Sequence, residues 1–258
     1  MKKHVSLFEE FVEEGVRKSD SGYEFDWMTD LPDDIMSLRF TKYRGRTLKT
    51  PDGETTYTYY YAYNLEKSDG STDLMKAIKT LESTIAPQDL RAFVNKAVMG
   101  FDSTFGSTNF SAIVAPESSS LVLKELVSQL EKKSGVAKLF SDSFVKAAST
   151  DIRLDVDKVE GMPEKTKKEV MRVYSRVTQP GKPFKIKEIF AKYRSLFRDF
   201  LLFNTKNDRE LVNSVEGQRV ILVDDFKTSG TTIREMIKQL SDAGAQHIAV
   251  FVLIKLGE

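Results

Sequence analysis

The chain has 258 residues, 40% apolar and 30% charged, which is enough for one large domain or two small ones with a hydrophobic core. Its net charge of +1 gives no strong signal for a nucleic-acid or membrane partner. The absence of cysteine excludes disulfides, thiolate metal sites and a cysteine nucleophile, and the presence of only two histidines excludes a histidine-rich metal site.

The N-terminal stretch predicts a helix. Apolar side chains recur on one face across residues 1–20, at Val5, Leu7, Phe8, Phe11, Val12 and Val16. The stretch turns acidic before any long apolar run, and no window approaches the roughly 20 apolar residues of a membrane-spanning helix. We therefore expect a cytoplasmic protein with no signal peptide and no membrane partner.

Residues 36–65 predict strands, and residues 72–100 predict helix. The pair Asp52-Gly53 between two strand-like runs is a hairpin signal. The tyrosine-rich run at 57–63 fits a half-buried strand, although such a run also suits stacking on a base.

From residue 106 onward, short apolar runs alternate with amphipathic helices. Strand-like runs are expected within 109–120 and at 136–140, 201–204, 219–223 and 247–256. Strands and helices in alternation are typical of a parallel α/β sheet. We therefore divide the chain into an N-terminal α+β extension, or hood, at 1–105 and a Rossmann-like α/β core with a parallel sheet at 106–258.

One stretch of this core, RVILVDDFKTSGTT, combines the features of a site for a phosphorylated sugar. The apolar run indicates a buried central strand, and ligands of open parallel sheets bind where such strands end. Asp224 and Asp225 stand at that end, where carboxylates can accept hydrogen bonds from sugar hydroxyls. The helix that follows offers unpaired amides and a partial positive charge to a phosphate. Close backbone approach and hydroxyl donors would come from Thr228, Ser229, Gly230, Thr231 and Thr232.

Other strand–loop–helix sites fit this stretch less well. The receiver domain of a response regulator also opens with an acidic pair, but it needs far more chain than the 33 residues that follow Asp225. The loop lacks the GxxxxGK[ST] pattern of a P-loop and the GxGxxG pattern of a dinucleotide fold. An ordinary capped helix would explain the hydroxyls but not the twin aspartates.

The stretch resembles the phosphoribosyl-pyrophosphate motif of type I phosphoribosyltransferases, in which two acidic residues, two variable positions and a Thr/Ser-Gly-x-Thr loop follow an apolar strand. The resemblance implies that fold, phosphoribosyl pyrophosphate as substrate, Mg²⁺, and transfer of the phosphoribosyl group to an unidentified small nitrogenous acceptor with release of pyrophosphate. It assigns residues 228–232 to the 5-phosphate. It also makes Asp224 and Asp225 catalytic residues that hold the ribose and contact the metal directly, or indirectly through ribose hydroxyls or water. Relatives often pair, so the resemblance implies a homodimer.

The resemblance extends to two further loops. A loop between an earlier strand and helix corresponds to the one that holds pyrophosphate in the family, and it contains Ala115, Pro116, Glu117, Ser118 and Ser119. An ordinary serine cap of the helix is the alternative. A basic stretch at 172–188 corresponds to the family's mobile loop, with Arg176, Lys182 and Lys185 as candidates for contact with pyrophosphate.

One departure from the family pattern bears on function. Related 6-oxopurine enzymes carry an aspartate at the position of Thr228, and a threonine cannot act as a general base at neutral pH. Salvage of hypoxanthine or guanine is therefore disfavoured. The alternative function is a non-catalytic sensor of phosphoribosyl pyrophosphate or a nucleotide on the same fold, and a scaffold for a protein partner is a third.

Overall fold

The structure is a computed structural model. Within residues 13–49 it describes only the backbone. The described residues are 13–19, 22–26, 36–40, 46–49, 56–65, 74–75, 77–78, 87–106, 108–118, 120–133, 138–182, 184–204, 208–227 and 230–256.

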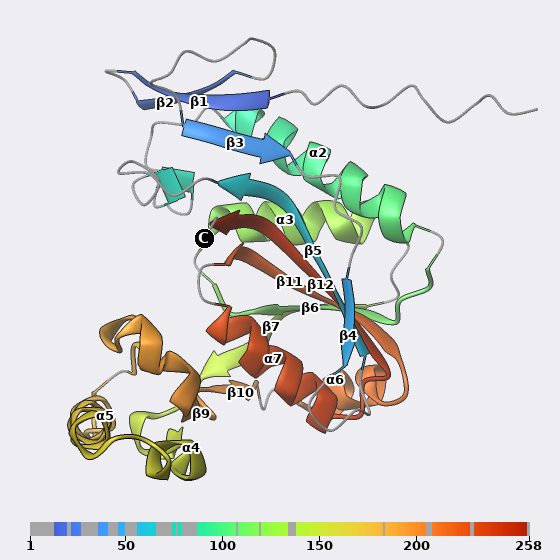
Figure 1. Ribbon diagram of the computed structural model, residues 1–258. Helices are drawn as coiled ribbons and strands as arrows, with labels where there is room; N and C mark the ends of the chain where they lie inside the picture. The colour runs from blue at the N-terminus through green and yellow to red at the C-terminus, as the bar shows by residue number, and fades with distance from the viewer. Residues whose placement is uncertain are drawn as a thin grey trace, which may run out of the picture.

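A mixed sheet with a parallel centre organises the molecule (Figure 1). Its strand order is β10-β7-β6-β11-β12-β5-β3-β1-β2, and β4 pairs with β5 beside this path. The neighbours from β7 to β5 are all parallel. These central strands are β5 (Thr56–Leu65), β6 (Ala112–Pro116), β7 (Lys138–Lys146), β11 (Arg219–Lys227) and β12 (His247–Leu256). The parallel α/β sheet predicted from the alternation of strands and helices is confirmed.

The N-terminal strands extend this sheet in antiparallel fashion. They are β1 (Glu13–Ser19), β2 (Gly22–Asp26), β3 (Met36–Phe40) and β4 (Arg46–Lys49). The predicted hairpin is present, since β4 pairs antiparallel with β5 across residues 50–55, which themselves lie outside the described residues. Because β5 belongs to the central sheet, the N-terminal region contributes to the same layer as the core, and the division at residue 105 stays a prediction.

The helix predicted for residues 1–20 is wrong where the structure describes it, because residues 13–19 form β1. Of the six apolar positions that suggested a helix, only Val16 lies in this strand, and the other five lie outside the described residues. Pairing with β2 and β3 therefore decides the conformation of this segment, which local periodicity could not reveal.

Helices cover both faces of the sheet. One face packs against α2 (Pro87–Phe105) and α3 (Leu121–Lys133), and the Tyr63 hydroxyl of β5 donates a hydrogen bond of 2.9 Å to the Phe93 carbonyl of α2. The other face packs against α6 (Asp208–Val215) and α7 (Thr231–Asp242). The buried side of α7 carries Ile233, Met236, Ile237 and Leu240 at helical spacing, which explains why this segment folds as a helix against the sheet.

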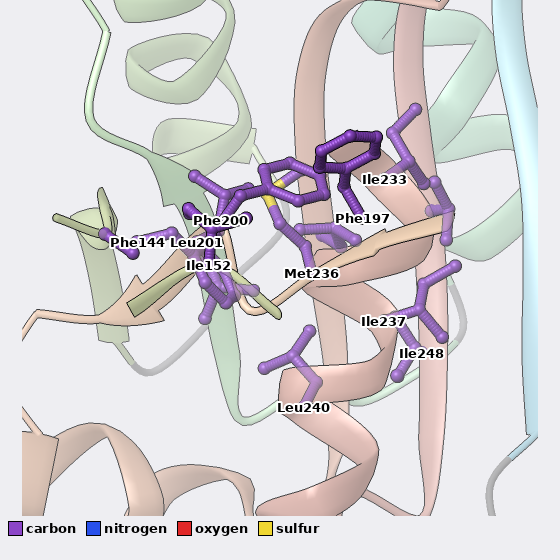
Figure 2. Close-up of a cluster of buried hydrophobic side chains, with 14 of the residues drawn as sticks. Phe144, Ile152, Phe197, Phe200, Leu201, Ile233, Met236, Ile237, Leu240 and Ile248 are labelled. Carbon is purple, nitrogen blue, oxygen red and sulfur yellow. The ribbon is translucent and has the colours of Figure 1, made fainter. Parts of the chain in front are cut away.

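The segment 147–200 lies between β7 and the edge strand β10 (Leu201–Phe203) and packs on the α7 side of the sheet. It contains α4 (Val156–Glu160), α5 (Glu164–Val177), the short strands β8 (Arg153–Leu154) and β9 (Phe197–Arg198), and 3-10 turns at Ser149–Asp151, Ile186–Glu188 and Ala191–Leu196. Figure 2 shows Phe197 and Phe200 of this segment beside Met236 of α7. The first part of the stretch predicted to be a mobile loop is helix instead, because Val173 and Val177 of α5 are buried in this second core.

Candidate functional site

The connections between strands locate a crevice at one edge of the sheet. From β6 the chain runs through α3 to β7, whereas from the adjacent β11 it runs through α7 to β12 on the other side. The two connections leave in opposite directions, and their helices cover opposite faces. Such a switch in direction leaves an open crevice at the carboxyl ends of the two strands, where ligands of doubly wound sheets bind. The predicted phosphate loop follows β11 and the predicted pyrophosphate loop follows the adjacent β6, so both begin at this edge of the sheet; that they bind one ligand stays a prediction.

The twin aspartates stand at the end of β11, beside this crevice. Leu222 pairs with Val114 of β6, so Asp224 lies two residues further toward the carboxyl edge. Asp224 and Asp225 are only 8% and 3% exposed, and the Asp225 amide donates a hydrogen bond of 2.9 Å to Asp224 Oδ1. Buried carboxylates are rare unless hydrogen bonds or charges compensate for their lost hydration. Two of them at a strand end therefore indicate a site for hydroxyl or cationic ligands.

The loop after β11 leads directly into the N-terminus of α7. Thr228 and Ser229 lie outside the described residues, whereas Gly230 is the N-cap residue and has φ 68°, in the left-handed region that favours glycine. A Cβ atom at Gly230 would lie 3.1 Å from Lys227 Cε, so the position is also crowded. Thr231 is buried and accepts a hydrogen bond of 3.3 Å from Arg234 Nη2. The helix N-terminus thus carries a partial positive charge at the crevice, with two basic side chains close by.

Tyr59 of β5 also belongs to this neighbourhood. The Lys227 ammonium lies 5.2 Å from the centre of the Tyr59 ring. The Tyr59 hydroxyl is buried and has no hydrogen-bond partner among the described residues. Burial raises the pKa of this phenol, the negative charge of Asp224 raises it further, and the positive charge of Arg234 lowers it. These electrostatic couplings show that Tyr59, Asp224 and Arg234 lie near one another.

Arg234 was not predicted as a site residue, and Tyr59 was considered only as part of a tyrosine run that also suits stacking on a base. Tyr57, Tyr59 and Tyr61 alternate along β5 toward the α7 side, while Tyr60 and Tyr63 are buried on the other face. The period of two therefore indicates the face for Tyr57, Tyr59 and Tyr61, but it breaks between Ala62 and Tyr63, where two consecutive side chains are buried on the same face. That this face reaches the twin aspartates depends on β12 lying between β5 and β11, which the sequence does not reveal.

The predicted pyrophosphate loop follows β6, and several of its groups are engaged within the protein. Ala115 is buried at the end of β6, where the β6–β7 register shifts between Val114 and Pro116. The Glu117 amide donates a 2.9 Å hydrogen bond to the Phe144 carbonyl of β7, and its side chain is exposed. Ser118 Oγ accepts a bond of 3.1 Å from the Ser120 amide. Ser119 lies outside the described residues.

Ser120 Oγ in turn accepts a weak 3.4 Å bond from the Leu123 amide in the first turn of α3. The serines of this loop thus act in part as a helix cap. A contact with pyrophosphate stays a prediction for this loop.

The basic residues predicted for the mobile loop make contacts within their own segment. Arg176 of α5 donates a hydrogen bond of 3.1 Å to the Glu188 carbonyl, and Lys185 forms an exposed ion pair of 3.8 Å with the Glu188 carboxylate. Lys182 is exposed in the turn after α5. The structure does not join these side chains to the twin aspartates, and their contact with pyrophosphate stays a prediction.

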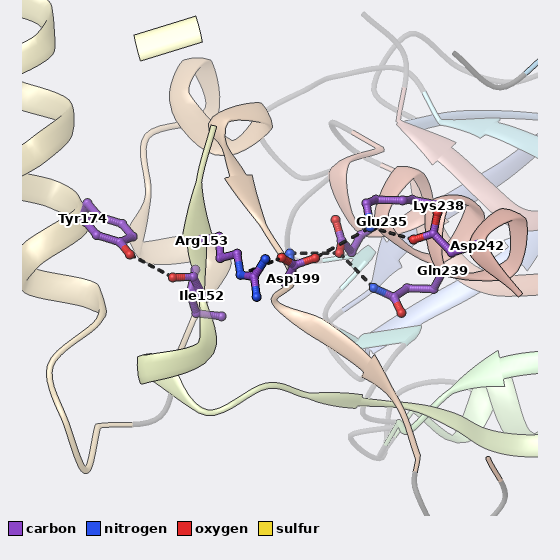
Figure 3. A network of polar contacts seen from close by, with 8 residues as sticks. All are labelled: Ile152, Arg153, Tyr174, Asp199, Glu235, Lys238, Gln239 and Asp242. Carbon is purple, nitrogen blue, oxygen red and sulfur yellow. Dashed lines mark hydrogen bonds and ion pairs between the residues drawn. The ribbon is translucent and has the colours of Figure 1, made fainter. Parts of the chain in front are cut away.

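A charged network anchors segment 147–200 to α7 (Figure 3). It lies beside a hollow of about 480 Å³. The Asp199 carboxylate lies 3.6 Å from Arg153 and 3.7 Å from Lys238 of α7. The Asp199 amide donates a 3.0 Å hydrogen bond to the buried carboxylate of Glu235, also on α7. The hollow is lined by Arg153, Leu154, Asp155, Val156, Asp157, Arg198, Asp199 and Lys238.

Arg198, which lies on this hollow, is paired with Asp155 at 2.8 Å. The hydrogen bond from Arg198, followed by that from Lys158, lowers the pKa of Asp155 to about 2. These groups therefore neutralise one another and hold β9 against the start of α4.

Within the described part of the chain, no group of three or more histidine, aspartate or glutamate side chains could hold a metal ion. The same residues contain no helix that is long and apolar enough to cross a membrane.

Comparison with known proteins identifies the family. The model of the phosphoribosyl transferase domain matches residues 94–258, well over half of the chain. The chain belongs to the phosphoribosyl transferase family. The fold class expected from the motif, a parallel α/β sheet of the type I phosphoribosyltransferase kind, is thereby confirmed, and the match of this phosphoribosyl transferase domain begins within α2.

More distant similarities accompany this match. A stretch of 41 residues is 54% identical to the transcriptional regulator GfcR of Methanobrevibacter smithii, and it spans 16% of this chain and 20% of the relative. Adenine phosphoribosyltransferase from Leishmania tarentolae superposes with a TM-score of 0.36 and 12% identity, over 74% of this chain and 91% of that chain. A hypothetical protein from Neisseria gonorrhoeae with bound ppGpp has a TM-score of 0.37 and 11% identity, over 66% of this chain and 69% of that chain. The family assignment rests on the domain match and not on these similarities.

Proposed function

We propose that this phosphoribosyl transferase domain binds phosphoribosyl pyrophosphate and transfers its phosphoribosyl group to a small nitrogenous acceptor. The observation that carries the proposal is the position of the buried Asp224 and Asp225 near the carboxyl end of β11, shortly before the left-handed Gly230 at the start of α7. Acceptors for sugar hydroxyls and donors for a phosphate thus lie at one strand end.

In this proposal the 5-phosphate, the ribose and the pyrophosphate of the ligand each contact different groups of the protein. The 5-phosphate docks at the N-terminus of α7, and Lys227 and Arg234 supply positive charge near Gly230. The ribose hydroxyls donate to Asp224 and Asp225. The pyrophosphate then extends toward the end of β6, since β6 is the strand next to β11 on the side away from β12.

The residues present also fit Mg²⁺. Two neighbouring carboxylates supply the hard oxygen ligands that this cation prefers, and in phosphate sites it takes one or two carboxylates together with substrate oxygens. Asp224 and Asp225 would therefore hold it, directly or through ribose hydroxyls or water. When bound, Mg²⁺ would neutralise part of the charge on the pyrophosphate.

The proposed reaction is a displacement at C1′ of the ribose. The lone pair of the acceptor nitrogen forms the new C–N bond, the C–O bond to pyrophosphate breaks, and pyrophosphate leaves with the electron pair. A proton is lost from the acceptor nitrogen to solvent or to the leaving group. The part played by the protein is to orient the ribose and to stabilise charge as it develops.

The second candidate is a sensor that binds the same ligand without turnover. The observation in its favour is the loop after β6, where the Glu117 amide bonds to β7 and Ser120 caps α3. Fewer donors then remain for a leaving pyrophosphate. The short match to a relative named as a transcriptional regulator points in the same direction.

Release of pyrophosphate distinguishes the two candidates. The protein would be incubated with phosphoribosyl pyrophosphate, Mg²⁺ and a panel of nucleobases and small amines, and free pyrophosphate measured. Release that depends on one acceptor supports the transferase. Binding of phosphoribosyl pyrophosphate without release for any acceptor would overturn it in favour of the sensor.

A further inference from the structure

Positive charge is concentrated in one short segment of the chain. Residues 164–194 contain ten lysines and arginines but only three acidic residues, whereas the whole chain contains 39 and 38. The segment therefore carries a net charge of +7 and the rest of the chain −6, which together give the +1 of the whole. The near-neutral net charge of the whole chain therefore hides a local excess of positive charge in residues 164–194. Such an excess makes the electrostatic potential around a segment positive.

Helix α5 arranges part of this charge as a stripe. Lys165, Lys168, Arg172 and Arg176 are all exposed, and at 100° per residue they fall within an arc of roughly 80°. The opposite side of the helix is buried through Val170, Val173 and Val177. The stripe rises about 16 Å along the helix axis at 1.5 Å per residue. Figure 1 shows α5 at the periphery of the molecule, away from the central sheet.

Few of these charges are neutralised by neighbours. Lys168 is 3.9 Å from Glu164, but both side chains are more than 70% exposed, and such surface pairs contribute little. Arg176 is held by a backbone carbonyl, which carries no net charge. Lys165 and Arg172 form no ion pair with any residue that the structure describes. The stripe therefore keeps most of its positive charge.

An exposed aromatic ring lies close to α5. The Tyr193 hydroxyl and the Lys192 ammonium approach the Glu169 carboxylate of α5 at 2.7 and 3.9 Å. Phe190 lies edge-on to Tyr193, with 6.3 Å between the ring centres, and is 55% exposed. Phe190 therefore presents an aromatic ring to solvent near the basic helix, and proteins that bind single strands use such rings to stack bases next to a basic groove.

We propose that the exposed face of α5, together with Phe190, binds a nucleic-acid strand through its phosphates. Alongside a duplex, a stripe of about 16 Å would match about five phosphates of one strand, at 3.4 Å of helix axis each; an extended single strand would offer fewer phosphates over the same length. A lipid surface fits less well, because membrane-bound amphipathic helices insert an apolar face and that of α5 is buried in the protein. The proposal does not depend on the phosphoribosyl site: Arg176 is the stripe residue that was also a candidate for pyrophosphate contact, and the test variant below leaves it unchanged.

Fluorescence anisotropy with labelled oligonucleotides tests this proposal. The full chain would be titrated against a single-stranded 20-mer and a duplex of the same sequence, at 50 to 200 mM salt. The test variant is Lys165→Gln/Lys168→Gln/Arg172→Gln. The matched control is Arg91→Gln/Lys124→Gln/Lys132→Gln, which removes the same charge from exposed positions on α2 and α3. Thermal melting confirms that both variants fold.

We expect the test variant to weaken single-strand binding about tenfold or more at 50 mM salt and to lower the slope of log K against log salt by about 2, while the control changes affinity less than twofold. Phe190→Ala should weaken single-strand binding more than duplex binding, because only unpaired bases stack. No binding by the wild type at 50 mM salt would overturn the proposal. Equal weakening of oligonucleotide binding by the test and control variants would also overturn it. So would a parallel titration in which the protein binds anionic lipid vesicles but neither oligonucleotide.

Discussion

The ammonium of Lys227 lies 5.2 Å from the centre of the Tyr59 ring, which joins the end of β11 to β5 across the intervening β12. This contact connects the loop that follows the twin aspartates with a strand from the N-terminal region. A cation over an aromatic face contributes about 0.5 to 2 kcal/mol, depending on its burial. Lys227, which precedes the proposed phosphate loop, therefore contacts a residue that lies about 170 positions earlier in the chain.

The first prediction separates the ring of Tyr59 from its hydroxyl. The hydroxyl is buried without a described partner, so Tyr59→Phe removes a desolvated polar group and should leave the free energy of unfolding unchanged or slightly higher. Tyr59→Ala removes the ring and should cost about 2 to 4 kcal/mol. Urea denaturation measures both. A loss of more than about 1 kcal/mol in Tyr59→Phe would show that the hydroxyl has a partner in the protein.

The second prediction concerns Gly230. Gly230→Ala should destabilise the protein by about 1 kcal/mol, because its φ of 68° is unfavourable for other residues, and should also weaken binding of phosphoribosyl pyrophosphate by crowding Lys227. Gly217→Ala is the matched control, since Gly217 has φ 69° and no heavy atom within 4 Å of the added Cβ. Calorimetry should find that Gly217→Ala binds phosphoribosyl pyrophosphate with the affinity of the wild type. If Gly230→Ala bound it equally well, that would argue against a phosphate at this loop.

The third prediction follows from the burial of Glu235. Burial raises its pKa above the ordinary 4.5, so the folded protein holds a proton that the unfolded chain releases, and stability falls as pH rises from about 4.5 through the raised pKa. Glu235→Gln keeps an acceptor for the Asp199 amide but has no charge to bury. The variant should therefore gain stability relative to the wild type as pH increases across this window. If the difference in free energy of unfolding between Glu235→Gln and the wild type were the same at pH 4 and pH 7, the raised pKa of Glu235 would be contradicted.

Much of the fold followed from local sequence patterns. The continuous apolar run at 219–223 indicated a central strand, and the spacing of Ile233, Met236, Ile237 and Leu240 fits the helix that covers it. The twin aspartates and Gly230 were predicted as site residues because their chemistry is visible in consecutive positions. Their place at the carboxyl edge agrees with the strand order.

Features that depend on distant pairing were not accessible from the sequence. Residues 13–19 pair with β2 and β3, and this outweighs the periodicity that suggested a helix. Arg234 lies one helical turn from Gly230, a local spacing that the sequence does contain, and the basic stretch at 172–188 was visible as well, but their places in the fold were not. The stretch expected to be a mobile loop contains buried valines whose partners, such as Phe197 and Tyr193, lie further along the chain.

The central claim is that Asp224 and Asp225 hold the ribose of phosphoribosyl pyrophosphate, and isothermal titration calorimetry with this ligand and Mg²⁺ tests it most directly. The wild type should bind, and Asp224→Asn/Asp225→Asn should lose at least about tenfold in affinity while keeping its melting behaviour, since charged hydrogen bonds contribute about 1.5 to 3 kcal/mol each. Asp242→Asn, at the exposed end of α7, serves as the control and should bind normally. Unchanged affinity in the double variant, or no binding by the wild type, would contradict the account.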